Sequence, residues 1–425
     1  MENAVIVSGV RTPIGKYLGG LKEVPAYRLG ALVLEAAVRR AGLEPGQVDE
    51  VIMGQSYQNG ESVNIARMAL LAAGWPVEIP GITLDRRCCS GLDAVCFAAM
   101  KIMCGQAEVV VAGGVESMSR AEFYIPGEFM KWGVGGGRDP RWGFMPRGHG
   151  SLDMWGIPLF DRIQRARVMS QPIERFGELN SMMTWAEAAA REEGITREAA
   201  DAWAERSHRK ACEASAGGRF ADEIVPVTVK DAKGEPLTID RDEPPRADTT
   251  LAKLARLKPV YPEGICTAGN SSTENDGAAA LVLVSARLAR TLERNARRPQ
   301  TILAASAVAA ADPTLTYPAV PAAVDKALRQ AGVGIGQIDL IEIQEAFAAQ
   351  VLADAKLMGL TAQETENKLN VNGSGISLGH PIGATGAMRL TTLLHEMNRR
   401  AAEYGLLTIC GGGGQGIAAV LKRNP

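Results

Sequence analysis

The first third of the chain alternates short apolar runs with segments of helical periodicity, and this alternation restricts the fold more than any other feature of the sequence. Apolar residues that recur every three or four positions predict helices, whereas short continuous apolar runs predict buried strands. The predicted strands lie at 4–8, 48–53 and 108–112, and the predicted helices at 27–41 and 89–103. Such alternation is typical of a layered α/β core.

The same alternation returns in the last third of the chain. There the predicted strands lie at 278–284, 302–311, 340–343, 406–409 and 417–421, and the predicted helices at 320–330 and 345–358. The pattern is lost between about 121 and 274, where a charged helix at 197–213 stands alone. We therefore expect two α/β blocks that flank an insertion. No sequence repeat is clear enough to count, although two similar alternations would suit a duplicated fold.

Length and charge exclude several classes of protein. The 425 residues suffice for two or three domains of about 150 residues each. The 46 Lys and Arg against 48 Asp and Glu leave a net charge of −2, which argues against a basic nucleic-acid-binding protein and against a disordered polyelectrolyte. The N-terminal segment does not resemble a secretory signal, and the uncharged stretch at 404–421 is too rich in glycine for a membrane span. Seven cysteines without a C-x-x-C pair predict free thiols in a reducing cytoplasm.

Cys88 follows a polar turn and directly precedes the apolar helix predicted at 89–103. The N–H groups and the dipole at a helix N-terminus stabilise a thiolate, which is the nucleophilic form of cysteine. Cys88 is therefore a candidate nucleophile, and the alternative is a small buried hydrophobic residue. For Cys96 and Cys104, inside or beyond the helix, we expect the structural role.

His380 is one of only four histidines, and it lies among glycines in the segment 379–386. Such glycines permit close approach of the backbone to a ligand. A base beside a thiol is the general arrangement of an activated nucleophile. The alternative is a turn histidine whose ring is satisfied by backbone groups. His149, His208 and His395 have no comparable setting.

Cys410 begins a turn with four consecutive glycines, 411–414, at the end of the strand predicted at 406–409. Consecutive glycines cost conformational entropy, so this turn must need positive φ angles or bare N–H groups directed at a developing negative charge. A fourth block, Glu342-Ile343-Gln344-Glu345-Ala346-Phe347, places polar side chains where a buried strand turns into a helix. Glu345 could instead simply favour the first turn of that helix.

Templates for metal and nucleotide sites do not match the sequence. The segment 9–16 differs from a phosphate-binding loop by one extra residue, and Tyr17 stands where Ser or Thr would bind the metal. Neither a zinc-ligand spacing nor a G-x-G-x-x-G at the start of a helix is present. We therefore predict no metal and no tightly bound cofactor.

Taken together and in this order, the four blocks resemble the thiolase family, whose members make or cleave 3-ketoacyl-CoA. The resemblance covers nearly the whole chain. Further segments that carry it are Arg11 to Lys16, Gly113 to Ser119, Phe220 with Glu223 to Val227, Thr267 to Asn270, and Asn275 to Ala278.

The resemblance implies a thiolase-like, five-layered αβαβα fold of two similar halves with an inserted loop domain. One half would comprise 1–121 and 275–297, the inserted domain 122–274 would cover coenzyme A, and the second half would comprise 298–425. The resemblance also implies a homodimer or homotetramer, with coenzyme A as a substrate.

The resemblance also implies roles for individual residues. Cys88 would carry the acyl group, His380 would activate it and bind the thioester oxygen, and Cys410 would exchange a proton as acid and base. The N–H groups of Cys88 and Gly412 would form one oxyanion hole, and His380 with a water held by the block around Gln344 would form the other. The residues expected along coenzyme A are Ser272, Arg246 and Met182.

The chemistry of the residues agrees with these roles. Cleavage of a carbon–carbon bond beside a thioester needs a soft nucleophile for the ketone, a proton donor for the departing enolate, and donors for two oxyanions. Two cysteines, one histidine and the N–H groups of a glycine-rich turn supply that set without a metal.

The sequence departs from the common pattern of the family at several positions. Asp85 and Gln344 stand where Asn is common, and the extra methylene of Gln344 moves its amide by roughly 1 Å, so we expect either a moved water or a direct amide donor. Ser181 stands where enzymes of the acetoacetyl type often carry His. The insertion 131–177, with Trp132, Trp142 and Trp155, suits a reshaped acyl pocket or a partner contact, or else is a solvated excursion.

These departures favour a degradative thiolase that acts on a 3-ketoacyl-CoA other than acetoacetyl-CoA, in the breakdown of a fatty acid or an aromatic acid. Two alternatives remain open. One is a biosynthetic acetoacetyl-CoA thiolase, and the other is a catalytically weakened acyl-CoA-binding subunit that needs a partner protein.

Overall fold

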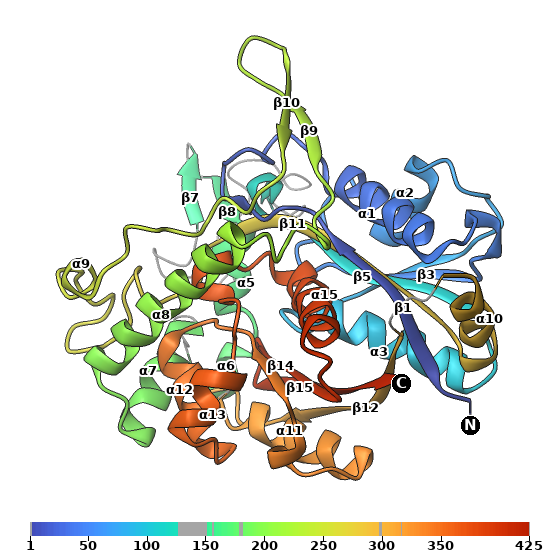
Figure 1. Ribbon diagram of the computed structural model, residues 1–425. Helices are drawn as coiled ribbons and strands as arrows, with labels where there is room; N and C mark the ends of the chain where they lie inside the picture. Colours follow the sequence, from blue (N-terminus) through green and yellow to red (C-terminus); the bar gives the residue numbers. More distant parts are fainter. Residues whose placement is uncertain are drawn as a thin grey trace.

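The computed structural model describes residues 2–125, 151–154, 157–177, 182–296, 300–315 and 317–424. These residues form a ten-stranded mixed sheet to which both predicted blocks contribute (Figure 1). The strands of the first block are β1 (Ala4–Arg11), β2 (Gly15–Lys16), β3 (Glu50–Gly54), β4 (Gly81–Leu84), β5 (Val109–Ser117) and β11 (Asn275–Ser285). Those of the second are β12 (Gln300–Ala310), β13 (Leu340–Ile343), β14 (Tyr404–Gly411) and β15 (Gln415–Asn424).

The two blocks repeat one pattern of strand pairing. In the first block, β1 pairs antiparallel with β11, β11 pairs antiparallel with β5, and β5 pairs parallel with β3. In the second block, β12 pairs antiparallel with β15, β15 pairs antiparallel with β14, and β14 pairs parallel with β13. The blocks join where Val5 and Ile6 of β1 pair with Ile302 and Thr301 of β12. The chain is therefore built from two structural repeats.

The helices that follow β1 and β12 end in the same way. Helix α1 (Ala26–Ala41) stops at Gly42 with φ of 71°, and α11 (Ala319–Ala331) stops at Gly332 with φ of 70°. A short 3₁₀ turn follows each helix, η1 (Pro45–Gln47) and η3 (Ile335–Gln337). Asp49 then accepts the N–H of Val109 at the start of β5, and Asp339 accepts the N–H of Tyr404 at the start of β14. The repeat thus extends to individual hydrogen bonds.

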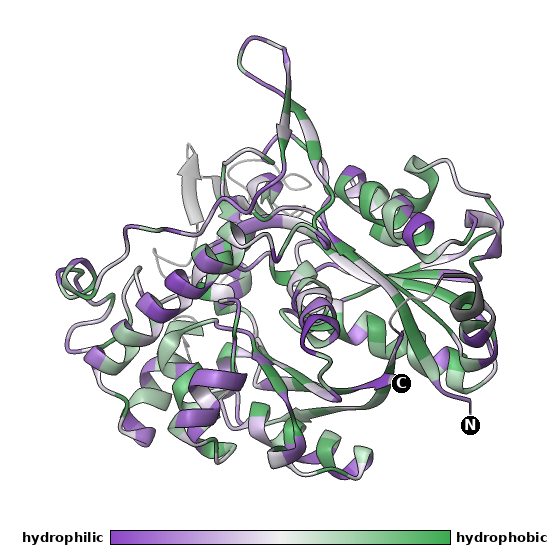
Figure 2. Ribbon diagram, in the orientation of Figure 1, coloured by the Kyte–Doolittle hydropathy of each residue, from purple (hydrophilic) through white to green (hydrophobic). Residues whose placement is uncertain are grey.

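Helices and sheet form the five layers that the sequence predicts, and the fold prediction is confirmed. Helices α1 and α2 (Ile65–Ala72) cover the outer face of the first block, and α11 and α12 (Ala348–Leu357) cover that of the second. Helices α3 (Ser90–Met103) and α15 (Ile382–Arg400) form the middle layer. Alternate residues of β11 face the middle and the outer layer, which makes this strand apolar from Ala278 to Val284 (Figure 2).

Glycines allow the middle layer to pack closely. A Cβ on Gly386 would lie 2.3 Å from the backbone nitrogen of Leu92, and a Cβ on Gly114 would lie 2.2 Å from the carbonyl oxygen of Gly383. Strand β5 runs through Gly113 and Gly114 to Ser117 instead of ending at them, because Gly114 admits the backbone of α15 and Gly113 admits that of β11. Gly383 and Gly386 likewise serve contacts between backbones, where the sequence suggested an approach to a ligand.

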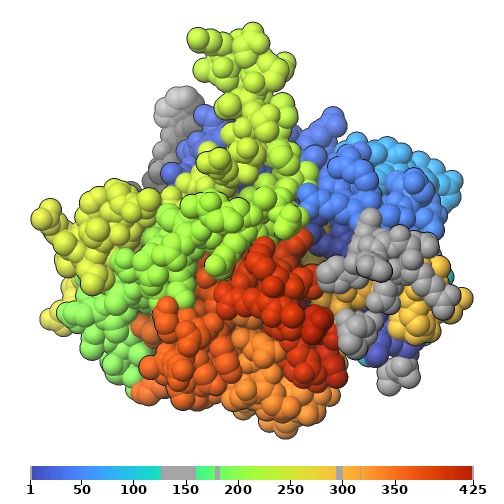
Figure 3. Space-filling view, in the orientation of Figure 1, coloured from blue at the N-terminus to red at the C-terminus, as the bar shows by residue number. Residues whose placement is uncertain are grey.

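The insertion contains more regular structure than the sequence indicates. It is preceded by η2 (Met118–Arg120), and its elements are β6 (Phe123–Tyr124), β7 (Ser151–Met154), β8 (Ile157–Asp161), α5 (Arg162–Val168), α6 (Ile173–Phe176), α7 (Met182–Glu193), α8 (Arg197–Ala216), β9 (Val227–Lys230), β10 (Pro236–Ile239) and α9 (Leu251–Leu254). The β9–β10 hairpin projects from the surface (Figures 1 and 3).

The prediction that the charged helix stands alone is wrong. Helices α7 and α8 pack against α12, and α8 also packs against α14 (Gly375–Leu378). Ala200, Trp203 and Ala204 of α8 are buried in the core of the second block. Small side chains on one face of the helix make this packing possible, and its many charged residues obscure that face in the sequence.

The remaining helices are α10 (Ala286–Ala296) and α13 (Ala362–Lys368). Helix α12 begins at Ala348, three residues later than predicted, because Phe347 is extended and bridges to Ser271. Within the described residues, no helix combines the length and the apolar character that a membrane crossing requires.

Candidate active site

One cavity of about 370 Å³ is lined by residues from both halves and from the insertion. Cys88 comes from the first half, His380 and Gly412 from the second, and Met182 from α7. Cys88 lies just before α3 and His380 just before α15. The two central helices therefore present these residues to one cavity, from equivalent places in the two repeats.

Cys88 is buried, and burial raises the pKa of its thiol to about 11. The positive charge of Arg87 and the backbone N–H groups of Gly412 and of Cys88 itself oppose this rise but do not cancel it. The sequence suggests that the helix N-terminus alone stabilises a thiolate, and the structure corrects this: desolvation outweighs it. At neutral pH Cys88 is a thiol, and its activation needs a nearby base.

His380 is held in an orientation that supplies such a base. Its backbone N–H donates to Asn275 Oδ1 at 2.8 Å, and its Nδ1 lies 2.7 Å from Thr385 Oγ1. The Thr385 hydroxyl donates its single proton to the carbonyl oxygen of Pro381 at 3.0 Å. It therefore accepts from Nδ1–H of His380, which leaves Nε2 as the unprotonated nitrogen.

The environment keeps this imidazole neutral. Burial, together with the positive charges of Arg389 and Arg167, lowers the pKa of His380 to about 3. A neutral ring with a free Nε2 can accept a proton from a thiol in the same cavity. His380 is thus no turn histidine satisfied only by backbone groups.

Cys410 lies at the end of β14, behind the wall of the cavity. It is 4% exposed and packs with Val320 and Ala346, and Ala346 itself lines the cavity. Burial raises the pKa of Cys410 well above its ordinary value, and negative charge on Cys88 raises it further. A thiol of high pKa holds its proton firmly, and the two sulfurs are close enough to interact electrostatically.

The turn after Cys410 has the backbone that the glycines predict. Gly413 and Gly414 have φ of 83° and 78°, values that residues with a Cβ rarely adopt. A Cβ on Gly414 would lie 2.5 Å from the carbonyl oxygen of Ala311. This tight turn brings the N–H of Gly412 to the sulfur of Cys88.

Gln344 and Glu345 are both fully buried but have different environments. Gln344 Oε1 accepts from Arg389 Nε at 3.1 Å, whereas its Nε2 has no hydrogen-bond partner among the described residues. The carboxylate of Glu345 accepts from Trp203 and Ser207 of α8, at 3.0 and 2.6 Å. Glu345 is therefore a buried link between the insertion and the second half, more than a residue that favours a helix start.

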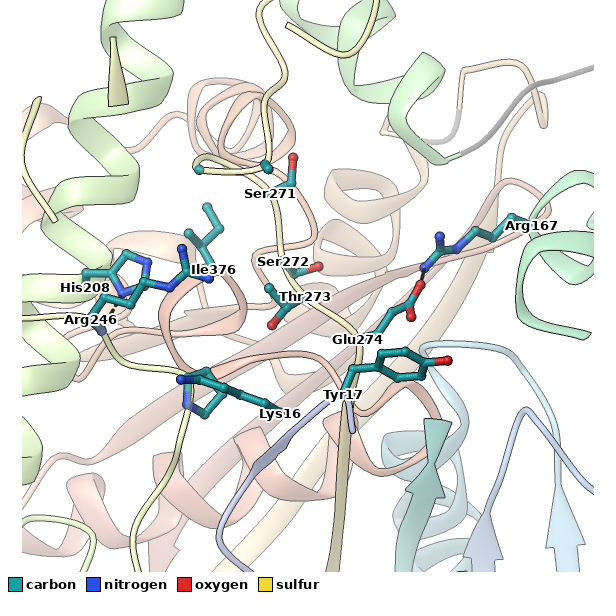
Figure 4. Close-up of a pocket in the computed structure, with 13 residues that line it drawn as sticks. Lys16, Tyr17, Arg167, His208, Arg246, Ser271, Ser272, Thr273, Glu274 and Ile376 are labelled. Carbon is teal, nitrogen blue, oxygen red and sulfur yellow. Dashed lines mark hydrogen bonds and ion pairs between the residues drawn. The ribbon is translucent and has the colours of Figure 1, made fainter. Parts of the chain in front are cut away.

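A second cavity of about 420 Å³ adjoins the first, and the two share Arg167 and residues 271–274 (Figure 4). Ser272 lines both cavities, and Arg246 lines the second, with its backbone N–H donating to His208 Nδ1 at 3.2 Å. Arg167 and Glu274 form an ion pair of 2.5 Å at the junction. The two cavities make a path from the outer face to Cys88.

Comparisons with known proteins agree with this geometry. Residues 4–287 match the model of the thiolase N-terminal domain, and residues 297–423 match that of the thiolase C-terminal domain. The chain belongs to the thiolase family. It is 43% identical over 430 aligned residues to an acetyl-CoA acetyltransferase of Pseudomonas aeruginosa and 40% identical over 426 to a beta-ketoadipyl-CoA thiolase of Acinetobacter baylyi, with full coverage of each chain.

A solved thiolase structure has the same fold. The crystal structure of the Bacillus anthracis acetyl-CoA acetyltransferase superposes with a TM-score of 0.87 at 40% identity, and the match covers 100% of this chain and 99% of that chain. The identification as an acyltransferase of the thiolase family therefore rests on sequence and fold together.

Several residues of this thiolase site were not found from the sequence. Thr385 sets the tautomer of His380, Asn275 holds its backbone, and Arg389 orients Gln344 while donating to the carbonyl oxygen of Gly379 at 2.7 Å. Thr385 and Arg389 lie five and nine residues after His380 in α15. The two residues are one helical turn apart on α15, and this spacing just after the histidine was the available signal.

Some predictions concern residues that the structure does not describe. Ser181, Trp132, Trp142 and Trp155 lie outside the described residues, and so does much of the insertion 131–177. Asp85 is described: its Oδ1 accepts the backbone N–H of Arg87 at 2.8 Å.

Proposed function

We propose that the chain cleaves or forms the carbon–carbon bond of a 3-ketoacyl-CoA through an acyl group carried on Cys88. The observation that carries this proposal is one cavity lined by Cys88, His380 and Gly412, with Cys410 buried behind it. Thiolases use coenzyme A as a substrate and not as a tightly bound cofactor. The described residues include no group of three or more side chains placed to hold a metal ion.

In the direction of cleavage, Nε2 of His380 accepts the proton of the Cys88 thiol, and the sulfur attacks the 3-keto carbon. The N–H groups of Cys88 and Gly412 stabilise the oxyanion that forms. The bond between C2 and C3 then breaks, and Cys410 donates its proton to the departing enolate to give acetyl-CoA.

The second half of the reaction restores the enzyme. The thiolate of Cys410 takes the proton of an incoming coenzyme A thiol, whose sulfur attacks the acyl carbon on Cys88. The thioester to Cys88 breaks, the shortened acyl-CoA leaves, and the Cys88 sulfur regains its proton from His380. The lowered pKa of His380, about 3, leaves Nε2 unprotonated before acylation and makes the imidazolium that forms a ready proton donor, which returns its proton to Cys88.

The thioester oxygen of the substrate needs a second set of donors. We assign this role to His380 and to a donor in the block around Gln344, whose Nε2 is buried and unpaired. The cavity along Ser272 and Arg246 would hold coenzyme A, with Met182 beside the reacting end.

We further propose that the physiological reaction is degradative and that the substrate is longer than acetoacetyl-CoA. Support comes from a further cavity of about 460 Å³ that adjoins the one around Cys88 and gives room for a larger acyl group. A biosynthetic acetoacetyl-CoA thiolase is the second candidate, because the Pseudomonas relative is an acetyl-CoA acetyltransferase. A weakened acyl-CoA-binding subunit with a partner protein is the third, because Gln344 replaces an Asn.

A panel of 3-ketoacyl-CoA substrates tests these alternatives on the purified chain. Thiolysis is followed by the loss of enolate absorbance, in parallel with iodoacetamide labelling of Cys88. We expect thiolysis of longer or branched substrates and protection of Cys88 by acylation. A strong preference for acetoacetyl-CoA would overturn the degradative refinement, and a complete lack of acylation would favour the acyl-CoA-binding subunit.

We also propose that the domains are 1–121 with 275–297, 122–274 and 298–425, and that the chain assembles as a homodimer or homotetramer. The edge strand β4 exposes Ile82, and α3 exposes Phe97 and Met100 beside it, which suits pairing between copies. Light scattering should show that Ile82→Lys lowers the mass of the assembly, and an unchanged mass would refute this interface. Seven free cysteines support a cytoplasmic location.

A further inference from the structure

A third cavity, the arginine-lined cavity, lies beside the one that contains Cys88. Its volume is about 460 Å³, and the two cavities share Tyr57, Arg87 and Ser170. Arg162 and Arg165 complete its charged lining, with Asp85 as the one carboxylate among the described lining residues. Among the described lining residues, three guanidinium groups therefore face one carboxylate.

Two buried donors in this cavity have no acceptor among the described residues. The Tyr57 side chain is 2% exposed, and its hydroxyl interacts with the guanidinium of Arg87 but has no acceptor for its own proton among the described residues. Nε of Arg162 is buried and also lacks an acceptor there. Buried polar groups without partners cost stability, so they are rare and mark places where a ligand supplies the missing acceptor.

The third guanidinium lies next to the reacting sulfur. Arg87 precedes Cys88, so its Cα lies about 3.8 Å from that of the nucleophile. The Arg87 guanidinium lies over the ring of Tyr57, 5.2 Å from the centroid, and its Nη2 donates to the carbonyl oxygen of Ala166 at 3.4 Å. Asp85, whose Oδ1 accepts the backbone N–H of Arg87, stabilises the positive charge of this guanidinium.

We propose that the arginine-lined cavity binds the far end of the acyl group and that this end is a carboxylate. The substrate class is then a 3-ketoacyl-CoA with a terminal carboxylate. This inference rests on the proposed function and specifies its substrate. A carboxylate accepts several hydrogen bonds and pairs well with guanidinium groups, so it satisfies Tyr57 and Arg162 together. The phosphates of coenzyme A are the other candidate anion, but the path lined by Ser272 and Arg246 adjoins the catalytic cavity through a different set of residues.

A matched pair of substrates tests this proposal. 3-Ketoadipyl-CoA and 3-ketohexanoyl-CoA have six acyl carbons each and differ in a terminal carboxylate against a methyl group. For the wild type we expect kcat/KM to be at least about tenfold higher with the carboxylated substrate, as for a charge-assisted hydrogen bond in a partly buried site. Arg162→Met and Tyr57→Phe should each lower that ratio, Arg162→Met by about tenfold, mainly through KM. Arg162→Lys should restore part of it, because the charge remains.

The controls separate this proposal from its rivals. Arg329→Met removes an exposed arginine of α11 and should leave the ratio unchanged. Equal or better cleavage of the methyl-ended substrate by the wild type would overturn the inference while leaving the proposed function intact. The inference would also fail if Arg162→Met lost kcat/KM equally on both substrates and had a raised KM for coenzyme A. It would fail likewise if Arg162→Met changed the mass of the assembly and left the ratio of kcat/KM unchanged. If neither substrate is cleaved and no acyl group appears on Cys88, the proposed function itself fails.

Discussion

The side chain of Thr385 provides a test of how the nucleophile is activated. Thr385→Val keeps the shape of this fully buried side chain but removes the hydroxyl that accepts from Nδ1 of His380. The imidazole then has no partner that fixes the proton on Nδ1. The tautomer with the proton on Nε2, which cannot accept a proton from Cys88, becomes populated.

The size of the effect follows from the lost hydrogen bond. A buried N–H without an acceptor costs about 1 to 3 kcal/mol. If that loss acts on the reactive tautomer alone, the rate of acylation falls by about 5-fold to 150-fold. We expect a fall of at least tenfold in the first-order rate of Cys88 acylation. Little change is expected in the KM for coenzyme A, because Thr385 does not line the path along Ser272.

The assay is single-turnover acylation across a range of pH, with Thr385→Ser as the matched control. The serine variant retains the hydroxyl and should keep most of the rate, although it loses the methyl group that the valine variant keeps. Because burial raises the pKa of Cys88 to about 11, the rate lost in the valine variant should return partly at high pH, where the thiol ionises without a base. Equal losses in both variants, or a valine variant with the wild-type rate, would refute the assigned tautomer.

Two further predictions concern stability. Gly375→Ala should destabilise the chain by more than about 3 kcal/mol in urea denaturation, because its Cβ would lie 2.2 Å from Nε2 of Gln344 and 2.4 Å from the carbonyl oxygen of Glu345. The control is Gly336→Ala, whose Cβ has open space around it. Similar losses of stability in both variants would contradict the packing. Glu342 accepts from Ser374 Oγ at 2.6 Å, and burial raises its pKa to about 8, so the folded state binds a proton that the unfolded state releases above about pH 4.5. Between about pH 4.5 and 8 the free energy of unfolding of the wild type should therefore fall, relative to that of Glu342→Gln, by up to about 1.4 kcal/mol per pH unit. If the difference between the two proteins stays constant with pH, Glu342 is ionised in the folded state and the prediction is wrong.

The sequence was sufficient to predict those strands and helices that bury apolar residues in a regular pattern. Most predicted strands and helices exist, and the strand at 340–343 has the predicted bounds. The two similar halves were expected, but no sequence repeat was counted, although a short one is present: Ala41 to Asp49 and Ala331 to Asp339 both have the pattern A-G-x-x-x-G-Q-x-D. The Asp at the end of the pattern has a physical role, because its carboxylate accepts an N–H group at the start of β5 or β14.

The rest of the site depends on contacts between segments distant in the chain. The sequence indicated that Cys88 and His380 belong to one site, but the tautomer of His380 depends on Thr385 and Pro381, and the orientation of Gln344 on Arg389. The role of Gly383 is likewise set by residues 267 positions away, since its N–H donates to Glu116 Oε2 at 2.8 Å. Periodicity and local motifs do not carry such information, because it arises only when α3, α15 and β5 are packed together.

Peptide mapping by mass spectrometry after incubation with acetyl-CoA alone tests the central claim most directly. Cys88 should take the acetyl group and release coenzyme A, while the neighbouring Cys89 and Cys410 remain unmodified. Cys88→Ala should show no adduct and no turnover, yet retain the circular dichroism spectrum of the wild type. An acetyl group on another cysteine, or turnover near the wild-type rate in Cys88→Ala, would contradict the account of this site.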